Sequence, residues 1–331
     1  MRPGETHDVP DPPPVPTPAA PTHVAARIVA EMVAPHIGDR QHRIRGALRE
    51  TVERIAGLRY LGHYTGADWD YAFEVSDRGA DDVNIGYLTV GCNLIGILAP
   101  LNEHLEPLGT GALIRTVLHS RGGAIYCDTV MQGERIIGVT AGRFDELSPR
   151  EPRVLEADRG IARLIRDLRG DFGQTSQDHG GYGKVGDGVE PWSPHGPGPS
   201  DFPTACREVL APNDLQYVAL VESGIVTHQD DLFGDAAVEE RFFRAGHTVE
   251  ARRHFYQQFA EELDARARDL GRRVHAVIGR GLHRIVFDVQ RGAVYFYRVG
   301  PESYLMGVTL NQPEVFTADL KMEWLVSYVR P

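Results

Sequence analysis

The sequence contains few cysteines, few lysines and no strongly basic stretch. Its three cysteines, Cys92, Cys127 and Cys206, are far apart and never form a CxxC pair, so neither a disulfide framework nor a zinc site is predicted. Lys184 and Lys321 are the only lysines, and the formal net charge is −11. Such a chain would repel nucleic acid and anionic lipid, because no basic stripe reverses the field locally. We therefore expect no nucleic-acid partner.

Long apolar runs are also scarce. The N-terminal segment lacks a basic region followed by an apolar one, so it predicts no secretory signal, and a cytoplasmic location is the expectation. One uncharged run, Val83 to Pro100, approaches the length of a membrane span, but it contains two Asn and three Gly. We interpret this run as a buried core helix and expect no membrane span.

Two segments rich in proline, glycine and small polar residues divide the chain. Residues 1–22 hold eight prolines and almost nothing apolar to bury, which is typical of a disordered or polyproline-type tail. Residues 175–201 are rich in Gly, Pro, Ser and Asp, which is typical of an interdomain linker. The sequence therefore predicts one domain over residues 23–174 and a second over residues 202–331.

The two predicted domains share a repeated segment. An offset of 169 residues aligns residues 113–140 with residues 282–309 without a gap, and 10 of the 28 paired positions are identical. Composition alone would give about two. The identical pairs are Leu113/Leu282, Arg115/Arg284, Val117/Val286, Gly123/Gly292, Ala124/Ala293, Tyr126/Tyr295, Val130/Val299, Gly138/Gly307, Val139/Val308 and Thr140/Thr309. The chain is therefore predicted to carry the same small fold twice.

Each copy of the repeat predicts three antiparallel strands joined by tight turns. Gly123 and Gly292 lie in the first turn, where a tight hairpin needs a positive φ. Helical periodicity predicts a helix before and after each meander, and each half begins with a further helix and a short strand. The predicted fold class is α/β (α+β): two α-β-α layered domains, each a mostly antiparallel sheet flanked by helices.

The predicted central helices of the two halves differ in character. In the second half, Tyr256, Phe259, Leu263 and Leu270 share one helical face within a strongly charged segment. The corresponding place in the first half is held by the apolar run that begins at Val83. We therefore predict a pseudo-symmetric pair with unlike helices, and we expect function to reside in that difference.

The order of these elements resembles that of the roadblock/dynein light chain family. The match is best in residues 292–329, GAVYFYRVGPESYLMGVTLNQPEVFTADLKMEWLVSYV, which look like the family's hairpin, glycine-containing turn, acidic connector and final helix. The first half is similar through residues 123–140, GAIYCDTVMQGERIIGVT, but it inserts residues 142–154 before its last helix. The resemblance covers about 110 to 130 residues of each half.

The resemblance implies a non-enzymatic role. Members of the family pair through the central helix and the strand after it, and they act as adaptors or as regulators of small Ras-like GTPases. For this chain, that implies a protein partner, no cofactor and no metal. It also implies an internal pseudo-dimer or a homodimer, since a flexible linker of roughly 30 residues permits internal pairing. The candidate interface consists of Phe255, Phe259, Leu263, Arg115 and Arg284.

Arg115 and Arg284 occupy matching positions in the repeat, each near the start of a strand. We interpret them as edge-strand charges that oppose aggregation, with contact to a partner as the alternative.

Several further motifs contain residue types that can carry chemistry, and a structural interpretation is favoured for most of them. His228-Gln229-Asp230-Asp231 places metal ligands together, but no second ligand cluster accompanies it, which favours a solvated turn. His275 and His283 are interpreted as surface histidines. The segment Gly180–Lys184 lacks the Walker spacing of a phosphate loop. Cys206 is the best candidate for a reactive thiol, while the other two cysteines are expected to be buried.

The resemblance therefore implies a tandem roadblock-like protein that acts as an interaction scaffold or regulator in bacterial signalling, with a small Ras-like GTPase as the implied partner class. A small-ligand sensor of the PAS or GAF type is the second hypothesis, which a concave apolar pocket on one sheet face would favour. An enzyme is the third, and it would need convergent polar residues that the sequence does not show.

Overall fold

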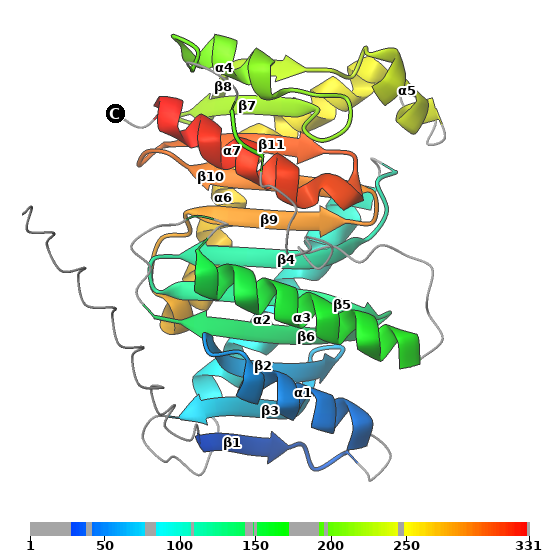
Figure 1. Cartoon of the computed structure of the whole chain (residues 1–331), viewed down its shortest axis with the longest axis vertical. Helices are drawn as coiled ribbons and strands as arrows, with labels where there is room; N and C mark the ends of the chain where they lie inside the picture. The colour runs from blue at the N-terminus through cyan, green and yellow to red at the C-terminus, as the bar shows by residue number, and fades with distance from the viewer. Residues whose placement is uncertain are drawn as a thin grey trace, which may run out of the picture.

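The computed structural model describes residues 28–37, 42–76, 84–106, 109–142, 148, 151–171, 192–194, 198–243 and 248–329. Within these residues, one sheet contains eleven strands in the order β1-β3-β2-β6-β5-β4-β9-β10-β11-β7-β8 (Figure 1). The strands are β1 (Ile28–Val33), β2 (Leu58–Thr65), β3 (Asp68–Ser76), β4 (Leu113–Ser120), β5 (Gly123–Met131), β6 (Glu134–Ala141), β7 (Tyr217–Glu222), β8 (Ile225–Asp231), β9 (Arg284–Val289), β10 (Gly292–Arg298) and β11 (Ser303–Thr309). The predicted tail and most of the predicted linker lie outside the described residues.

Helices cover both faces of the sheet. They are α1 (His42–Arg54), α2 (Ile85–Leu105), α3 (Pro152–Asp171), α4 (Phe202–Val209), α5 (Ala236–Phe243), α6 (Val249–Ile278) and α7 (Val315–Val329), with a 3₁₀ turn at Gln312–Glu314. The predicted fold class, a mostly antiparallel sheet flanked by helices in each half, is confirmed.

The two halves of the chain share the sheet through one pair of strands. β4 and β9 pair antiparallel, with Arg115 opposite Asp288 and His119 opposite Arg284. Each of these strands also pairs within its own half, β4 with β5 and β9 with β10. The sequence left open whether the two halves pair within one chain or between two chains. The β4–β9 ladder pairs them within one chain. We call the β4–β9 pair the seam.

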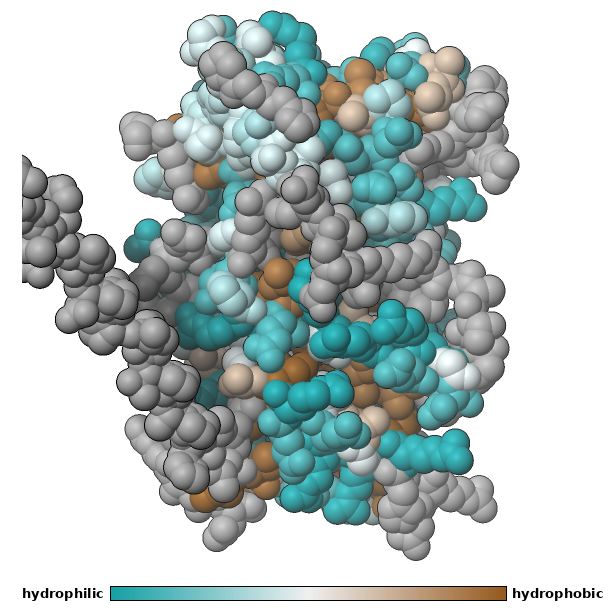
Figure 2. Space-filling view, viewed as in Figure 1, coloured by the Kyte–Doolittle hydropathy of each residue, from teal (hydrophilic) through white to brown (hydrophobic). Residues whose placement is uncertain are grey.

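The two faces of the sheet carry separate hydrophobic cores. One core lies beneath α2 and α6, and the other lies beneath α1, α3, α4 and α7, which are in front in Figure 1. Figure 2 shows this front face, where hydrophilic residues cover most of the described surface over α1 and α3 and apolar residues appear in small patches between them. The alternation of side chains along each strand supplies both cores, because successive residues point to opposite faces.

Two of the repeated identities are explained by one backbone contact. A Cβ atom added at Gly123 would lie 2.3 Å from the carbonyl oxygen of Thr140, and one at Gly292 would lie 1.9 Å from that of Thr309. The two glycines have φ values of 157° and 159°, which side chains rarely adopt. Both glycines therefore allow the second and third strands of each meander to pair closely.

A second repeated glycine makes room for the closing helix of each half. A Cβ atom at Gly138 would lie 2.5 Å from Cδ1 of Ile161 in α3, and one at Gly307 would lie 2.3 Å from Sδ of Met322 in α7. The missing side chain lets each helix pack close to the sheet. The helices that follow the two meanders therefore occupy equivalent positions.

Several elements differ from the sequence-based expectation. β1 and α5 were not predicted, and the tract His228–Asp231 belongs to edge strand β8 and is not a solvated turn. The apolar run after Val83 does form a helix, α2, which packs on the sheet and against α6. Among the described residues, α2 alone has the length and apolar composition of a membrane span.

Candidate interaction surface and the seam between the halves

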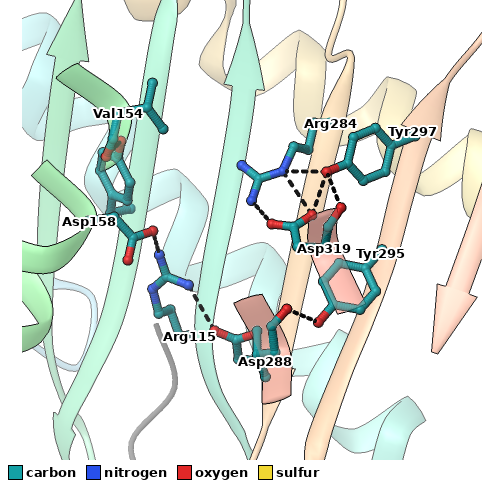
Figure 3. Close-up of polar contacts among 10 residues, drawn as sticks. Arg115, Val154, Asp158, Arg284, Asp288, Tyr295, Tyr297 and Asp319 are labelled. Carbon is teal, nitrogen blue, oxygen red and sulfur yellow. Dashed lines mark hydrogen bonds and ion pairs between the residues drawn. The ribbon is translucent and has the colours of Figure 1, made fainter. Parts of the chain in front are cut away.

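Arg115 is the centre of a buried ion cluster at the seam. Its guanidinium donates to Asp158 of α3 and, at 2.8 Å, to Asp288 of β9, and its Nε lies 3.4 Å from Asp128 of β5. Figure 3 shows Arg115 between Asp158 and Asp288, which come from opposite halves of the chain. The cluster therefore joins the two halves electrostatically as well as through the strand ladder.

Arg284 occupies the equivalent position in the second half but has different neighbours. It donates to Asp319 of α7 and, at 3.1 Å, to the hydroxyl of Tyr297, which in turn donates to Asp319 (Figure 3). By the 169-residue offset, Tyr297 replaces Asp128, and His119 stands where the second half has Asp288. The seam is therefore pseudo-symmetric in geometry but not in charge.

Burial at the seam shifts the pKa values of several ionisable groups. Burial raises the pKa of Asp128 to about 7, although the charge of Arg115 opposes the shift, and Asp158 and Asp288 raise it further. Burial also raises the pKa of Asp158. Across the seam, burial and the charge of Arg284 lower the pKa of His119 to about 3. His119 is therefore a neutral imidazole at physiological pH.

The interpretation of Arg115 and Arg284 as edge-strand charges is wrong. Their exposed fractions are 1% and 0%, because β4 and β9 lie at the middle of the sheet. The edges are β1 and β8. The alternative interpretation was contact with a partner. Arg115 does contact Asp288, which belongs to the other half of its own chain.

The other three candidate interface residues lie where α2 meets α6. The ring of His104 in α2 lies 5.6 Å from the ring of Phe255 and 5.6 Å from that of Phe259. Phe259 and Leu263 are fully buried, and Phe255 is half-buried. These residues therefore hold the two halves together, and Phe259 and Leu263 are not accessible to an outside partner.

An uncharged hollow lies between α2 and the strands β1 and β3. Ile85, at the start of the helix, is 72% exposed. It borders a hollow of about 460 Å³ whose lining carries no charged side chain. The lining residues are Met32, Trp69, Ile85, Leu88, Thr89, Cys92 and Asn93. This hollow offers a partner apolar surface and two uncharged polar groups.

A second hollow, of about 640 Å³, lies beside the C-terminal part of α6 and is rich in arginine. Its arginines are Arg268, Arg272, Arg280 and Arg298, and its other lining residues include Ala267, His275, Leu282 and Pro301. Asp264 bonds two of these arginines, and Asp269 lies 3.0 Å from Arg272. Four guanidinium groups against two carboxylates leave the hollow with a positive balance, which suits an acidic group.

The remaining sequence candidates are scattered over the structure. His275 lines the arginine-rich hollow, where its Nδ1 lies 2.6 Å from the carbonyl oxygen of Arg272, and His283 lies in the loop before β9. The prediction that Cys206 is the most reactive thiol is wrong, because the residue is fully buried and burial raises its pKa. Cys127 is also buried, with a pKa raised to about 11, and Cys92 is half-buried.

Comparisons with known proteins found similar solved structures. No protein-family model matches the chain, and no curated protein matches it. A structure described as MglB with tetrameric arrangement aligns over 41% of this chain and 91% of its own, with 16% identity and a TM-score of 0.32. The gliding protein MglB of Thermus thermophilus aligns over 42% of this chain and 96% of its own, with 17% identity and a TM-score of 0.31.

A roadblock/LC7 domain from Streptomyces avermitilis aligns over 39% of this chain and 93% of its own, with 15% identity and a TM-score of 0.24. The resemblance is one of fold. Each of these roadblock-type chains corresponds in length to about one half of this chain, and at such identities the likeness says nothing about function.

Proposed function

We propose that this chain is a non-enzymatic interaction scaffold or regulator that binds a protein partner through the face formed by α2 and α6. The observation that carries the proposal is the unlike chemistry of the two hollows on that face, one uncharged and one rich in arginine. Exposed apolar surface and arginine are each typical of interaction surfaces. The buried seam and the buried Phe259 and Leu263 connect the two halves beneath this face.

The chemistry of the hollows defines the partner that fits. Ile85 and its neighbours suit an apolar side chain, while the arginines of α6 suit carboxylate or phosphate groups. A small Ras-like GTPase in bacterial signalling is the partner class that the roadblock resemblance implies, and we propose it as the first class to test.

Paired substitutions test the surface. Ile85→Asp places a charge in the α2 hollow, and Ile225→Asp is its control, because Ile225 is similarly exposed at 65% but lies on edge strand β8. Arg272→Glu reverses a charge in the α6 hollow, and Arg54→Glu is its control on the opposite face, where Arg54 has a comparable ion pair within its helix.

The measurement is the affinity of each purified variant for the small GTPases of the source organism, loaded with GDP or with a GTP analogue, by isothermal titration calorimetry. We expect Ile85→Asp and Arg272→Glu to weaken binding at least tenfold, which corresponds to about 1.4 kcal/mol. The two controls should bind as the unmodified chain does. Equal binding by all four folded variants would exclude this face, and nucleotide hydrolysis by the chain alone would contradict a non-enzymatic role.

A small-ligand sensor is the second candidate function. The hollow beside α6 has the volume of a small-molecule site. Its lining comes from α6, the loop before β9, the end of β10 and the turn after it, and not from the concave middle of the sheet. A sensor would require a small anion to raise the melting temperature of the unmodified chain but not that of Arg272→Glu.

A further inference from the structure

Three metal-ligating side chains from separate parts of the sequence meet at the edge of the sheet. Cys206 lies in α4, and His228 and Asp230 lie on edge strand β8. Pairing with β7 places His228 opposite Leu220 and Asp230 opposite Val218, so both side chains point to the face that α4 covers. One ligand atom from each of the three residues lies within 4.8 Å of the other two.

The three ligand types match those of zinc. A thiolate sulfur, an imidazole nitrogen and a carboxylate oxygen each bind Zn²⁺ at about 2.0–2.3 Å, which in a tetrahedral site separates the ligand atoms by roughly 3.3–3.8 Å. Nε2 of His228 lies 2.9 Å from Oδ2 of Asp230, and Cys206 lies within the 4.8 Å limit. Small side-chain rotations therefore bring all three atoms to bonding distance of one ion.

The charges of the cluster also suit a divalent cation. A Cys206 thiolate and the Asp230 carboxylate carry two negative charges, and a neutral His228 carries none, so one Zn²⁺ would be balanced. A coordinating thiol is deprotonated by the metal ion that it binds.

The site is accessible from one side and enclosed on the other. The side chains of His228 and Asp230 are 24% and 26% exposed, so an ion can enter from solvent, while Cys206 lies at the buried end. The ring of Phe202 in α4 lies edge-on to that of His228, with ring centres 5.5 Å apart. This aromatic contact packs the imidazole against α4, the helix that carries Cys206.

We propose that Cys206, His228 and Asp230 form a binding site for Zn²⁺ or a zinc-like divalent ion, with water as the fourth ligand. The ion would join α4, the first helix of the second half, to edge strand β8. An edge strand lacks a neighbouring strand on one side, so a metal link there would stabilise the part of the sheet with the least support.

The test is titration of the full-length, reduced chain with Co²⁺, which reports zinc-type sites by absorbance. We expect one ion per chain, the visible bands of tetrahedral cobalt and a near-ultraviolet thiolate-to-cobalt charge-transfer band, all displaced by one equivalent of Zn²⁺. Cys206→Ser should abolish the charge-transfer band. The matched control is Cys92→Ser, which alters the more accessible thiol on α2 and should leave the spectrum unchanged.

Two further variants keep the proposal testable if Cys206→Ser does not fold. His228→Gln and Asp230→Asn change partly exposed side chains, and each should weaken Zn²⁺ binding at least tenfold in a competition titration with a chelator. The proposal is overturned if the unmodified chain shows no charge-transfer band. It is also overturned if folded His228→Gln and Asp230→Asn bind Zn²⁺ as tightly as the unmodified chain does.

Discussion

Arg115 and Asp288 face each other across the seam, with Nη1 of the arginine 2.8 Å from Oδ2 of the aspartate and both side chains buried. They are directly opposed in the β4–β9 register although 173 residues separate them in the sequence. Arg115 is also the guanidinium that balances Asp128 and Asp158. The stability of the whole sheet should therefore depend on this one cation.

Arg115→Met should destabilise the chain by about 3–5 kcal/mol, because it removes the guanidinium that pairs directly with Asp158 and Asp288 in the buried cluster. Arg54→Met is the control, since Arg54 makes an exposed pair with Glu50 that is worth about 0–1 kcal/mol. Urea denaturation followed by circular dichroism measures both. A loss below about 1 kcal/mol for Arg115→Met would mean that the carboxylates take up protons at little cost.

The raised pKa of Asp128 predicts a pH dependence of stability. The folded chain keeps this proton up to about pH 7, whereas the unfolded chain releases it near the ordinary value of 3.8. The stability contributed by Asp128 is therefore fully present below the unfolded pKa and is lost as pH rises through the folded pKa.

Asp128→Asn, which stays neutral, should gain stability relative to the unmodified chain between pH 5 and pH 8, by on the order of 2 kcal/mol. Asp167→Asn, at a position 76% exposed on α3, should show no such trend. Melting temperatures across this range decide the point. Parallel curves for Asp128→Asn and the unmodified chain would show that Asp128 is ionised throughout.

The repeated glycines should differ in how well they tolerate alanine. Gly292→Ala would place Cβ 1.9 Å from a backbone carbonyl oxygen, which cannot move without disturbing the sheet, so we expect a loss above about 2 kcal/mol. Gly307→Ala meets the flexible side chain of Met322 and should cost less. Gly46→Ala in α1 meets nothing within 4 Å and should stabilise by about 0.5–1 kcal/mol. Chemical denaturation measures the free energy of unfolding of the three variants. A reversed order of these stabilities would contradict the packing argument.

The two halves should associate when they are made as separate chains. Residues 1–174 and 202–331 each leave one seam strand unpaired, and a long unpaired edge is prone to association. Co-expression should give a one-to-one complex by size exclusion with light scattering, and Arg115→Met should weaken it. The intact chain, at 36.6 kDa, serves as the reference for the mass of one complete sheet. Halves that stay separate when mixed at micromolar concentration would show that the covalent connection maintains the seam.

The sequence predicts the meanders better than the contacts between them. Alternating apolar residues and glycine-containing turns identify β9 to β11, because that information is local. The β4–β9 pairing is not local. The identity of a residue also does not reveal whether it is buried, so the sequence does not distinguish the buried Arg115 from an exposed arginine. Edge strand β1 was missed because its sequence, IVAEMV, does not alternate apolar and polar residues.

The candidate surfaces also depend on contacts between residues that are far apart in the sequence. The helical period correctly indicated that Phe259 and Leu263 lie on an apolar face, but period alone does not reveal that α2 of the same chain covers it. Cys206 and His228 lie 22 residues apart in different elements, so no spacing rule links them. The register of β8 against β7 brings them together.

The unlike helices α2 and α6 have one more consequence. A pair of identical chains related by a twofold axis displays every surface twice, so it can be occupied on both sides. This chain displays the uncharged hollow once and the arginine-rich hollow once. A molecule that touches both helices can bind in a single orientation and at one copy per chain. Any assembly built on this face would therefore have a fixed direction, a property that a symmetric pair cannot confer.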